Sequence, residues 1–177
     1  MNHKKMNPSK KPHKTHVTKL SSYKPLLVIL GIIVFIVALI QVSQGGFDLI
    51  DSMRYFMGLF FLAFGSFKLV DLKGFVDMFA EYDVVTKRVR AWGFLYPFFE
   101  LALGFAYLVN ADPLSTNLAT IALMTVSSIG VAKALSGKQK IRCACLGSVV
   151  KLPVTTVTLI EDLGMGLMAI AMLISLL

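Results

Sequence analysis

Five long apolar runs divide this chain of 177 residues, and they constrain its fold more than any other feature. A helix needs roughly 20 mostly apolar residues to cross a bilayer. The chain is 56% hydrophobic with a mean hydropathy of +0.72, and its charged residues cluster between the apolar runs. These features predict an all-α, polytopic transmembrane helix bundle in contact with a lipid bilayer. The predicted spans are residues 25–42, 52–70, 91–109, 118–135 and 153–177.

The net charge of +8 does not indicate a nucleic-acid partner, because the basic residues lie beside the predicted spans. Basic residues in that position orient the helices and contact anionic lipid. Residues 1–24 contain seven lysines and no acidic residue, which predicts a disordered, cytosolic tail. No small-residue cleavage site follows Val42, so the first run, residues 25–42, is expected to be an uncleaved membrane anchor. Residues 52–177 are then expected to form one four-helix membrane domain.

The distribution of Lys and Arg predicts the orientation of the bundle. Residues 68–90 and 133–151 contain five basic residues each, whereas residues 44–51 and 110–117 contain none. Arg54 is the exception on the sparsely charged side. By the positive-inside rule, the N-terminus is cytosolic and the C-terminus lies outside, as expected in a bacterial inner membrane. The loop between the fourth and fifth spans is then at the cytosolic edge.

The segment that follows the second span has a helical apolar pattern. Apolar residues repeat there at i, i+3, i+4 and i+7, and charged residues occupy the other face. This pattern predicts a short amphipathic helix lying in the membrane interface. Trp92 and Tyr96, at the start of the third span, are expected to be interfacial aromatics. The apolar stripe is Leu72, Phe75, Val76 and Phe79.

Three acidic residues lie inside predicted spans, where each ionised group costs about 2.5–3.5 kcal/mol on insertion scales. Glu100 lies near the middle of the third span, and Glu161 and Asp162 lie in the fifth. One interpretation is that these acids are neutralised by a partner, for instance Glu100 or Glu161 by Lys68. The other is a site for a cation, a proton or a redox partner. Both remain open from the sequence.

The sequence Cys143-Ala144-Cys145 contains the only two cysteines of the chain. A disulfide across this spacing would close a very small ring and would be easily reduced. The neighbouring Lys140 and Arg142 favour the thiolate, which is the reactive form. Two thiolates can also bind a soft metal ion such as Cu(I), Zn(II) or a mercury-like ion. A pair of interfacial thiols without chemistry is the third interpretation.

A row of methionines extends the metal interpretation into the fifth span. Glu161, Met165, Met168 and Met172 lie on one helical face. A soft-metal site would use Cys143, Cys145, Glu161, Asp162 and Met165. Methionine rows are also typical of adaptable packing in a core.

Several stretches of the sequence resemble the DoxX-like superfamily, and the cysteine motif resembles its methylamine-utilisation MauE branch. The resemblance covers about residue 52 to the C-terminus. Leu146 stands where phenylalanine is usual, and the N-terminal span precedes the usual four-helix core. The stretches that carry the resemblance are Gly65-Ser66-Phe67-Lys68-Leu69-Val70-Asp71, Phe79-Ala80-Glu81-Tyr82, Tyr96-Pro97-Phe98-Phe99-Glu100-Leu101-Ala102-Leu103-Gly104 and Cys143-Ala144-Cys145-Leu146-Gly147.

The resemblance implies a redox-associated membrane protein that takes part in disulfide formation or in the maturation of partner proteins outside the cytosol, often with a thioredoxin-like partner. The predicted orientation puts the cysteines near the cytosol instead, so that either electrons enter there, or the pair handles a metal, or the loop dips into the membrane. The candidate catalytic residues are Cys143, Cys145 and Glu100, with Glu161 or Asp162 as further proton donors. The alternative function is transport or delivery of a soft metal such as copper or mercury, with a metal-binding protein as partner. The candidate cofactors are accordingly a quinone or a soft metal ion. A structural scaffold is the third candidate.

Overall fold

The computed structural model describes residues 24–136, 142–143, 152–153 and 156–176, and the basic tail lies outside this part of the chain. The described residues form six helices and one pair of two-residue strands. The predicted all-α bundle is therefore confirmed for the described part of the chain. The elements are α1 (Lys24–Ser43), α2 (Leu49–Val70), α3 (Leu72–Phe79), α4 (Arg90–Leu108), α5 (Pro113–Ser136), β1 (Arg142–Cys143), β2 (Leu152–Pro153) and α6 (Thr156–Ile174).

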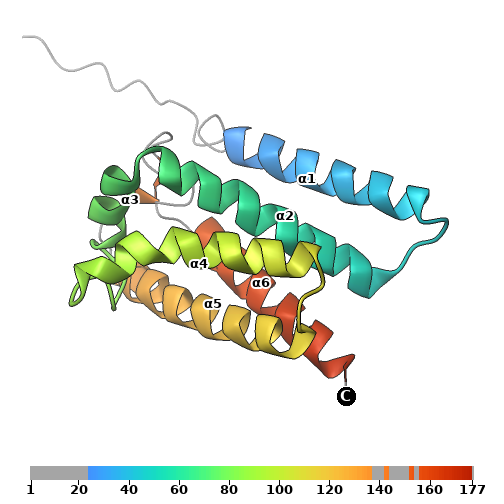
Figure 1. Ribbon diagram of the computed structural model, residues 1–177. Coiled ribbons are helices and arrows are strands. Elements are labelled where there is room, and N and C mark those ends of the chain that lie inside the picture. The colour runs from blue at the N-terminus through green and yellow to red at the C-terminus, as the bar shows by residue number, and fades with distance from the viewer. Residues whose placement is uncertain (1–23, 137–141, 144–151, 154–155, 177) are drawn as a thin grey trace, which may run out of the picture.

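The long helices run alternately up and down, so that their connections lie at two ends of the bundle (Figure 1). α2 packs extensively along α4, and α5 packs extensively along α6. α1 lies on the outside of α2, and α4 has a smaller contact with α5. β1 and β2 pair antiparallel, with Cys143 opposite Leu152. The short helix α3 closes one end of the bundle and lies beside β1.

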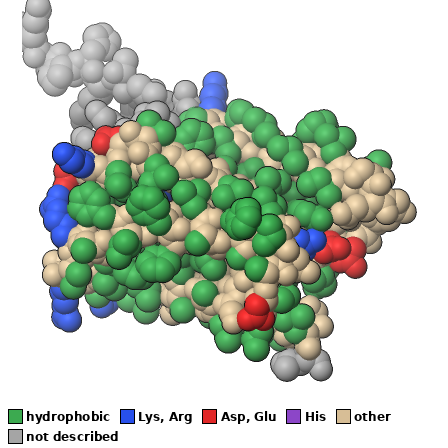
Figure 2. Space-filling view, viewed as in Figure 1, with side chains coloured by type: hydrophobic (Ala, Val, Ile, Leu, Met, Phe, Trp, Pro, Cys, Tyr) green, Lys and Arg blue, Asp and Glu red, His purple; other side chains and the backbone are tan. Residues whose placement is uncertain are grey.

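Four of the described helices, α1, α2, α4 and α5, are long and apolar enough to cross a membrane. They coincide with the first four predicted spans. α5 begins at residue 113, earlier than the predicted 118, because a proline is well accommodated in the first turn of a helix. The exterior of the bundle is largely apolar along its sides (Figure 2), as expected for a surface that faces lipid. α6 contains 19 residues, and its crossing of the membrane stays a prediction.

Glycines allow α2 and α4 to approach each other closely. A Cβ atom added to Gly104 on α4 would lie 2.9 Å from the Gly58 carbonyl oxygen and from the Leu62 backbone nitrogen. A Cβ atom added to Gly65 would lie 3.1 Å from the Leu101 side chain and 3.4 Å from the Glu100 Cβ. Small residues at such contacts are typical of membrane helix pairs, where close backbone packing replaces the hydrophobic drive.

Arg54, the one basic residue on the sparsely charged side, has a structural explanation. Its guanidinium group donates hydrogen bonds to the carbonyl oxygens of Tyr107 and Leu108, at 3.0 and 3.3 Å. These are among the last carbonyls of α4, which lack partners within the helix. Arg54 also forms an ion pair with Asp51 at 3.0 Å. A cation at this helix end is favourable because the helix dipole is negative there.

The short helix α3 is present as predicted, but its apolar face does not lie on lipid. Phe75, Val76 and Phe79 are all fully buried within the bundle, packed in the same core as α4 residues. The apolar face of α3 therefore packs on protein, whereas the position of α3 in the membrane interface stays a prediction. The periodicity identifies a buried face correctly, but it does not distinguish lipid from protein as the partner. Asp71 begins α3 by accepting a hydrogen bond from the Gly74 backbone nitrogen at 3.0 Å.

The alternating helix directions place the described basic residues mainly at one end of the bundle. The start of α1, the end of α2, α3, the start of α4 and the end of α5 meet at this end. Blue side chains gather there in Figure 2, while acidic side chains and a single basic group mark the other end. We call the first end the basic end. Its described Lys and Arg residues are Lys24, Lys68, Lys73, Lys87, Arg88, Arg90 and Lys133.

Candidate functional site

A small polar cavity lies inside the bundle near the basic end, where α2, α3, α4, α5 and α6 meet. Its volume is about 40 Å³, which is room for a few water molecules because one water needs roughly 10–15 Å³ on this measure. Four of its charged or ionisable lining residues come from three different helices. They are Lys68 of α2, Glu100 of α4, and Glu161 and Asp162 of α6.

Lys68 and Glu100 form the central ion pair of the cavity. The Lys68 ammonium donates a hydrogen bond to Glu100 Oε1, and both residues are buried, at 7% and 4% exposure. The ammonium also lies over two aromatic rings, 5.0 Å from the centre of Tyr96 and 5.6 Å from the centre of Phe75. Such cation–π contacts stabilise a charge that has lost its water. The sequence left open whether Lys68 pairs with Glu100 or Glu161, and the structure selects Glu100.

The second oxygen of Glu100 is buried and accepts no hydrogen bond from the described residues. A buried, unpaired carboxylate oxygen is unfavourable by about 1–3 kcal/mol, and by more when it is charged. In contrast to Glu100 Oε2, the polar side chains of another buried cluster in this bundle have hydrogen-bond partners. The Tyr107 hydroxyl lies 2.9 Å from both Asn117 Oδ1 and Thr120 Oγ1, and Asn117 donates to the Pro113 carbonyl.

On the opposite wall of the cavity, α5 and α6 contribute a second polar pair. The Ser127 hydroxyl donates a hydrogen bond of 2.7 Å to Asp162 Oδ2. Glu161, the preceding residue of α6, also lines the cavity and is partly buried. The two walls thus place a lysine and a glutamate opposite a serine and two acidic residues.

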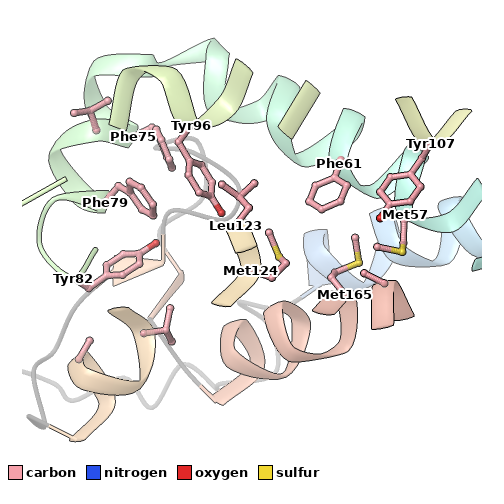
Figure 3. Packing of buried hydrophobic residues seen from close by; sticks show 14 of the residues in the cluster. Met57, Phe61, Phe75, Phe79, Tyr82, Tyr96, Tyr107, Leu123, Met124 and Met165 are labelled. Carbon is pink, nitrogen blue, oxygen red and sulfur yellow. The ribbon is translucent and has the colours of Figure 1, made fainter. Parts of the chain in front are cut away.

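Four aromatic rings that line the cavity, those of Phe75, Phe79, Tyr82 and Tyr96, lie together (Figure 3). Phe75 and Phe79 of α3 stack on each other at 5.0 Å, and Phe79 lies 4.7 Å from Tyr96. Tyr82 contacts Phe79 edge-to-face at 5.5 Å. Tyr96 is 3% exposed, so the expectation that it is an interfacial aromatic is wrong. Its ring belongs to the wall of the cavity and also carries the cation–π contact to Lys68.

Glu100, Glu161 and Asp162 are the predicted site residues that the structure brings to one cavity. Cys143 belongs to β1, whose backbone lies beside α3, the helix that provides Phe75 and Phe79 to the cavity wall. The side chain of Cys143 and all of Cys145 lie outside the described residues.

The metal interpretation gains no support from the described residues. No group of three His, Cys, Asp or Glu side chains converges among them. Met165 and Met172 are buried in the main core, at 2% and 4% exposure, as expected for methionines that serve packing. The cysteine part of the proposed metal site lies outside the described residues.

Sequence reasoning missed three polar lining residues, Tyr96, Tyr82 and Ser127. Ser127 lies in an apolar run without a motif, and its role is visible only because Asp162 faces it across α5 and α6. A signal for Tyr82 was present, since it extends the apolar stripe of α3 by one turn. Tyr82 is 5% exposed and belongs to the buried core.

A multi-pass bundle with a charged and polar cavity between its helices defines a helical integral membrane protein. The chain matches the family described as methylamine utilisation protein MauE over residues 26–175. It therefore belongs to the MauE family. The match includes α1, so it begins nearer the N-terminus than the resemblance noted from residue 52 onward. The division of the chain into an N-terminal helix, residues 25–42, and a four-helix domain, residues 52–177, stays a prediction. No curated protein and no solved structure matched the chain.

Proposed function

We propose that this MauE-family membrane protein performs thiol–disulfide exchange through Cys143 and Cys145 with a thioredoxin-like partner. The observation that supports the proposal is the position of β1 beside α3, because α3 also contributes Phe75 and Phe79 to the lining of the cavity that contains Glu100. Family membership supports it further. The chain has no other cysteines, and Lys140 and Arg142 favour the thiolate.

The exchange takes place between two cysteine pairs, Cys143–Cys145 and the cysteine pair of the partner, and it needs no further oxidant. A thiolate of the reduced partner attacks one sulfur of the Cys143–Cys145 disulfide, forming a mixed disulfide and releasing the other cysteine as a thiolate. The second thiol of the partner then attacks the mixed disulfide. The partner ends as a disulfide and the Cys143–Cys145 pair as a dithiol, so two electrons and two protons have moved to this protein. The strained ring expected for this cysteine spacing favours the reduction.

The proposed orientation places the basic end of the bundle in the cytosol, in agreement with the positive-inside rule. The backbone of Cys143 lies at this end, near α3. A cytosolic position matches the direction of the step above, since thiols in the cytosol are kept reduced and electrons would enter there. The C-terminus then lies outside.

Glu100 is the group that would accept or return a proton during the exchange. Its burial, its pairing with Lys68 and its unpaired Oε2 atom are the features that support this role. Glu100 belongs to a helix pair, α2 and α4, that is closely packed at Gly65 and Gly104. Glu100 is proposed here as a proton-holding residue that acts through the cavity and not by contact with sulfur.

The test is a thiol-dependent mobility shift in native membranes. After oxidation and after reduction, free thiols are labelled with a large maleimide, and the shift is read on a gel. We expect two labels on the reduced wild type and none on the oxidised one. Cys143→Ser and Cys145→Ser should each accept one label in both states, and the double variant none. Two labels on the wild type after oxidation would contradict the proposal.

Partner specificity and the metal alternative can be separated with the same proteins. The oxidised wild type should accumulate a reducible mixed disulfide with a purified, reduced thioredoxin-like protein whose second cysteine is replaced by serine, because that cysteine resolves the mixed disulfide. Cys143→Ser and Cys145→Ser, which cannot form the Cys143–Cys145 disulfide, should accumulate none. If Cu(I) or Hg(II) protects both thiols of the reduced wild type while no disulfide forms under oxidation, soft-metal binding is the better account.

A further inference from the structure

Among the described residues that line the cavity, acidic side chains outnumber basic ones. Lys68 is the only basic side chain among the described residues that line it, whereas Glu100, Glu161 and Asp162 are all acidic. The remaining ionisable groups among the described lining residues, Tyr82 and Tyr96, cannot supply a positive charge. With all three carboxyls ionised, the cavity would contain a net charge of −2, since 1 − 3 = −2. No described side chain offsets this excess.

An uncompensated charge inside a membrane bundle is very unfavourable, and the structure offers three ways to remove it. A metal ion is one, but no group of three metal-binding side chains converges in the described residues. Hydrogen bonds to ionised carboxylates are another, and Ser127 supplies one such bond, to Asp162. Glu100 Oε2 has none, although Glu100 is only 4% exposed. Binding of protons is the third way, and it removes charge without further ligands.

The geometry of the cavity suits shared protons. Glu100 Oε2 is an unpartnered acceptor, and the cavity it lines has room for a few water molecules at about 40 Å³. Asp162 lies on the other wall, hydrogen-bonded to Ser127 at 2.7 Å. Water between the two walls would join the free oxygen of Glu100 to the α6 carboxyls. The aromatic rings of Phe75, Phe79 and Tyr96 also line this cavity.

We propose that this cavity is a buried proton-binding site, in which a proton taken from water is bound as a carboxylic O–H and shared through internal water between Glu100 on α4 and Asp162 on α6. Lys68 stays charged and fixes one oxygen of Glu100, which leaves Oε2 as the oxygen that gains and loses the proton. Only a proton moves, so no oxidant or reductant takes part. The site extends beyond thiol exchange, because none of its residues is a cysteine and it would bind protons whatever the state of Cys143 and Cys145.

The test is infrared spectroscopy of the full chain in lipid nanodiscs at neutral pH, in H₂O and in D₂O. We expect a carboxylic C=O band that shifts to lower frequency in D₂O. Asp162→Asn and Glu100→Gln should each weaken or displace this band, and Asp162→Glu should restore a band. Glu81→Gln is the matched control, because Glu81 is exposed, and it should leave the band unchanged.

Two further measurements keep the test decisive. The spectrum of the Cys143→Ser/Cys145→Ser variant should contain the same band, which separates this proposal from thiol chemistry. If a Glu100 or Asp162 variant does not fold by circular dichroism, wild type labelled with ¹³C at aspartate carboxyls assigns the band directly. The absence of any protonated carboxyl band in the wild type at neutral pH would overturn the proposal. A band unaffected by substitution at both Glu100 and Asp162 would also overturn it.

Discussion

Lys68 of α2 and Glu100 of α4 form a buried ion pair that joins the two most closely packed helices of the bundle. Lys68 lies about one helical turn from Gly65 on α2, and Glu100 is the neighbour of Leu101, which Gly65 faces on α4. The close approach of the two helices and the ion pair therefore occur at the same place. This arrangement explains why a lysine and a glutamate are tolerated inside predicted spans. It also leaves one oxygen of Glu100 facing a polar cavity.

Because Lys68 and Glu100 form a buried ion pair, we expect that the effects of substituting the two residues on stability are not additive. Removal of one partner of a buried ion pair breaks the pair while the other polar group stays buried, at a cost of roughly 3–5 kcal/mol. Glu100→Gln and Lys68→Met should therefore each lower the free energy of unfolding in detergent micelles by about 3 kcal/mol. The double variant Lys68→Met/Glu100→Gln should lose less stability than the sum of the two single losses. Strictly additive losses in the double variant would show that the two side chains do not interact.

The α2–α4 contact predicts that Gly104 does not tolerate even alanine. A Cβ atom there would lie 2.9 Å from two backbone atoms of α2, which cannot move aside as a side chain can. Gly104→Ala should lower the free energy of unfolding by about 2 kcal/mol, in the range of overpacked cores. Gly164→Ala is the control, because nothing lies within 4 Å of its added Cβ. Equal stability of the two variants would argue against the close approach.

Substitution of Arg54, at the opposite end of the bundle, should have a smaller effect on stability. Its hydrogen bonds to the last carbonyls of α4 are charge-assisted, and such bonds contribute roughly 1.5–3 kcal/mol. Arg54→Gln should lower the free energy of unfolding by about 1.5 kcal/mol. Arg88→Gln, at an exposed site, should change it by less than about 0.5 kcal/mol. If thermal unfolding of the two variants is indistinguishable, the capping role of Arg54 is wrong.

The buried position of α3 can be separated from a position on lipid by substitution. Phe75→Ala removes a fully buried ring and should destabilise the bundle by about 3–5 kcal/mol, the usual cost for such a truncation. Lys73→Ala, on the exposed face of the same helix, should have little effect. Limited proteolysis of the loop after α3 gives a second readout. A Phe75→Ala protein with wild-type stability would place the apolar face of α3 on lipid after all.

Hydropathy and charge spacing alone predict most of the fold, because lipid imposes strict requirements on the length and apolar character of a helix. The first four spans coincide with α1, α2, α4 and α5. Lys and Arg are concentrated in alternate connecting segments of the sequence, and in the structure most of these side chains lie at one end of the bundle. The apparent exception, Arg54, was unexplained from sequence because its partners, the Tyr107 and Leu108 carbonyls, are more than fifty residues away.

The site was predictable only in part. An acidic residue inside an apolar span is energetically unfavourable and therefore conspicuous in the sequence. Glu100, Glu161 and Asp162 could be identified in this way. The partner of Lys68 was not, because the choice between Glu100 and Glu161 depends on which helix α2 packs against. Tyr96 was misjudged for a related reason: an aromatic residue near the start of a span has the same pattern whether its ring meets lipid headgroups or, as here, Lys68 and Phe79.

The central claim, that Cys143 and Cys145 undergo reversible thiol–disulfide exchange at the cytosolic end of the bundle, is tested most directly by labelling in sealed membrane vesicles. A membrane-impermeant maleimide is applied to inside-out and right-side-out vesicles, after oxidation and after reduction. The account predicts labelling only in reduced, inside-out vesicles. Labelling of intact right-side-out vesicles would contradict the orientation, and labelling that is the same after oxidation and reduction would contradict the thiol chemistry.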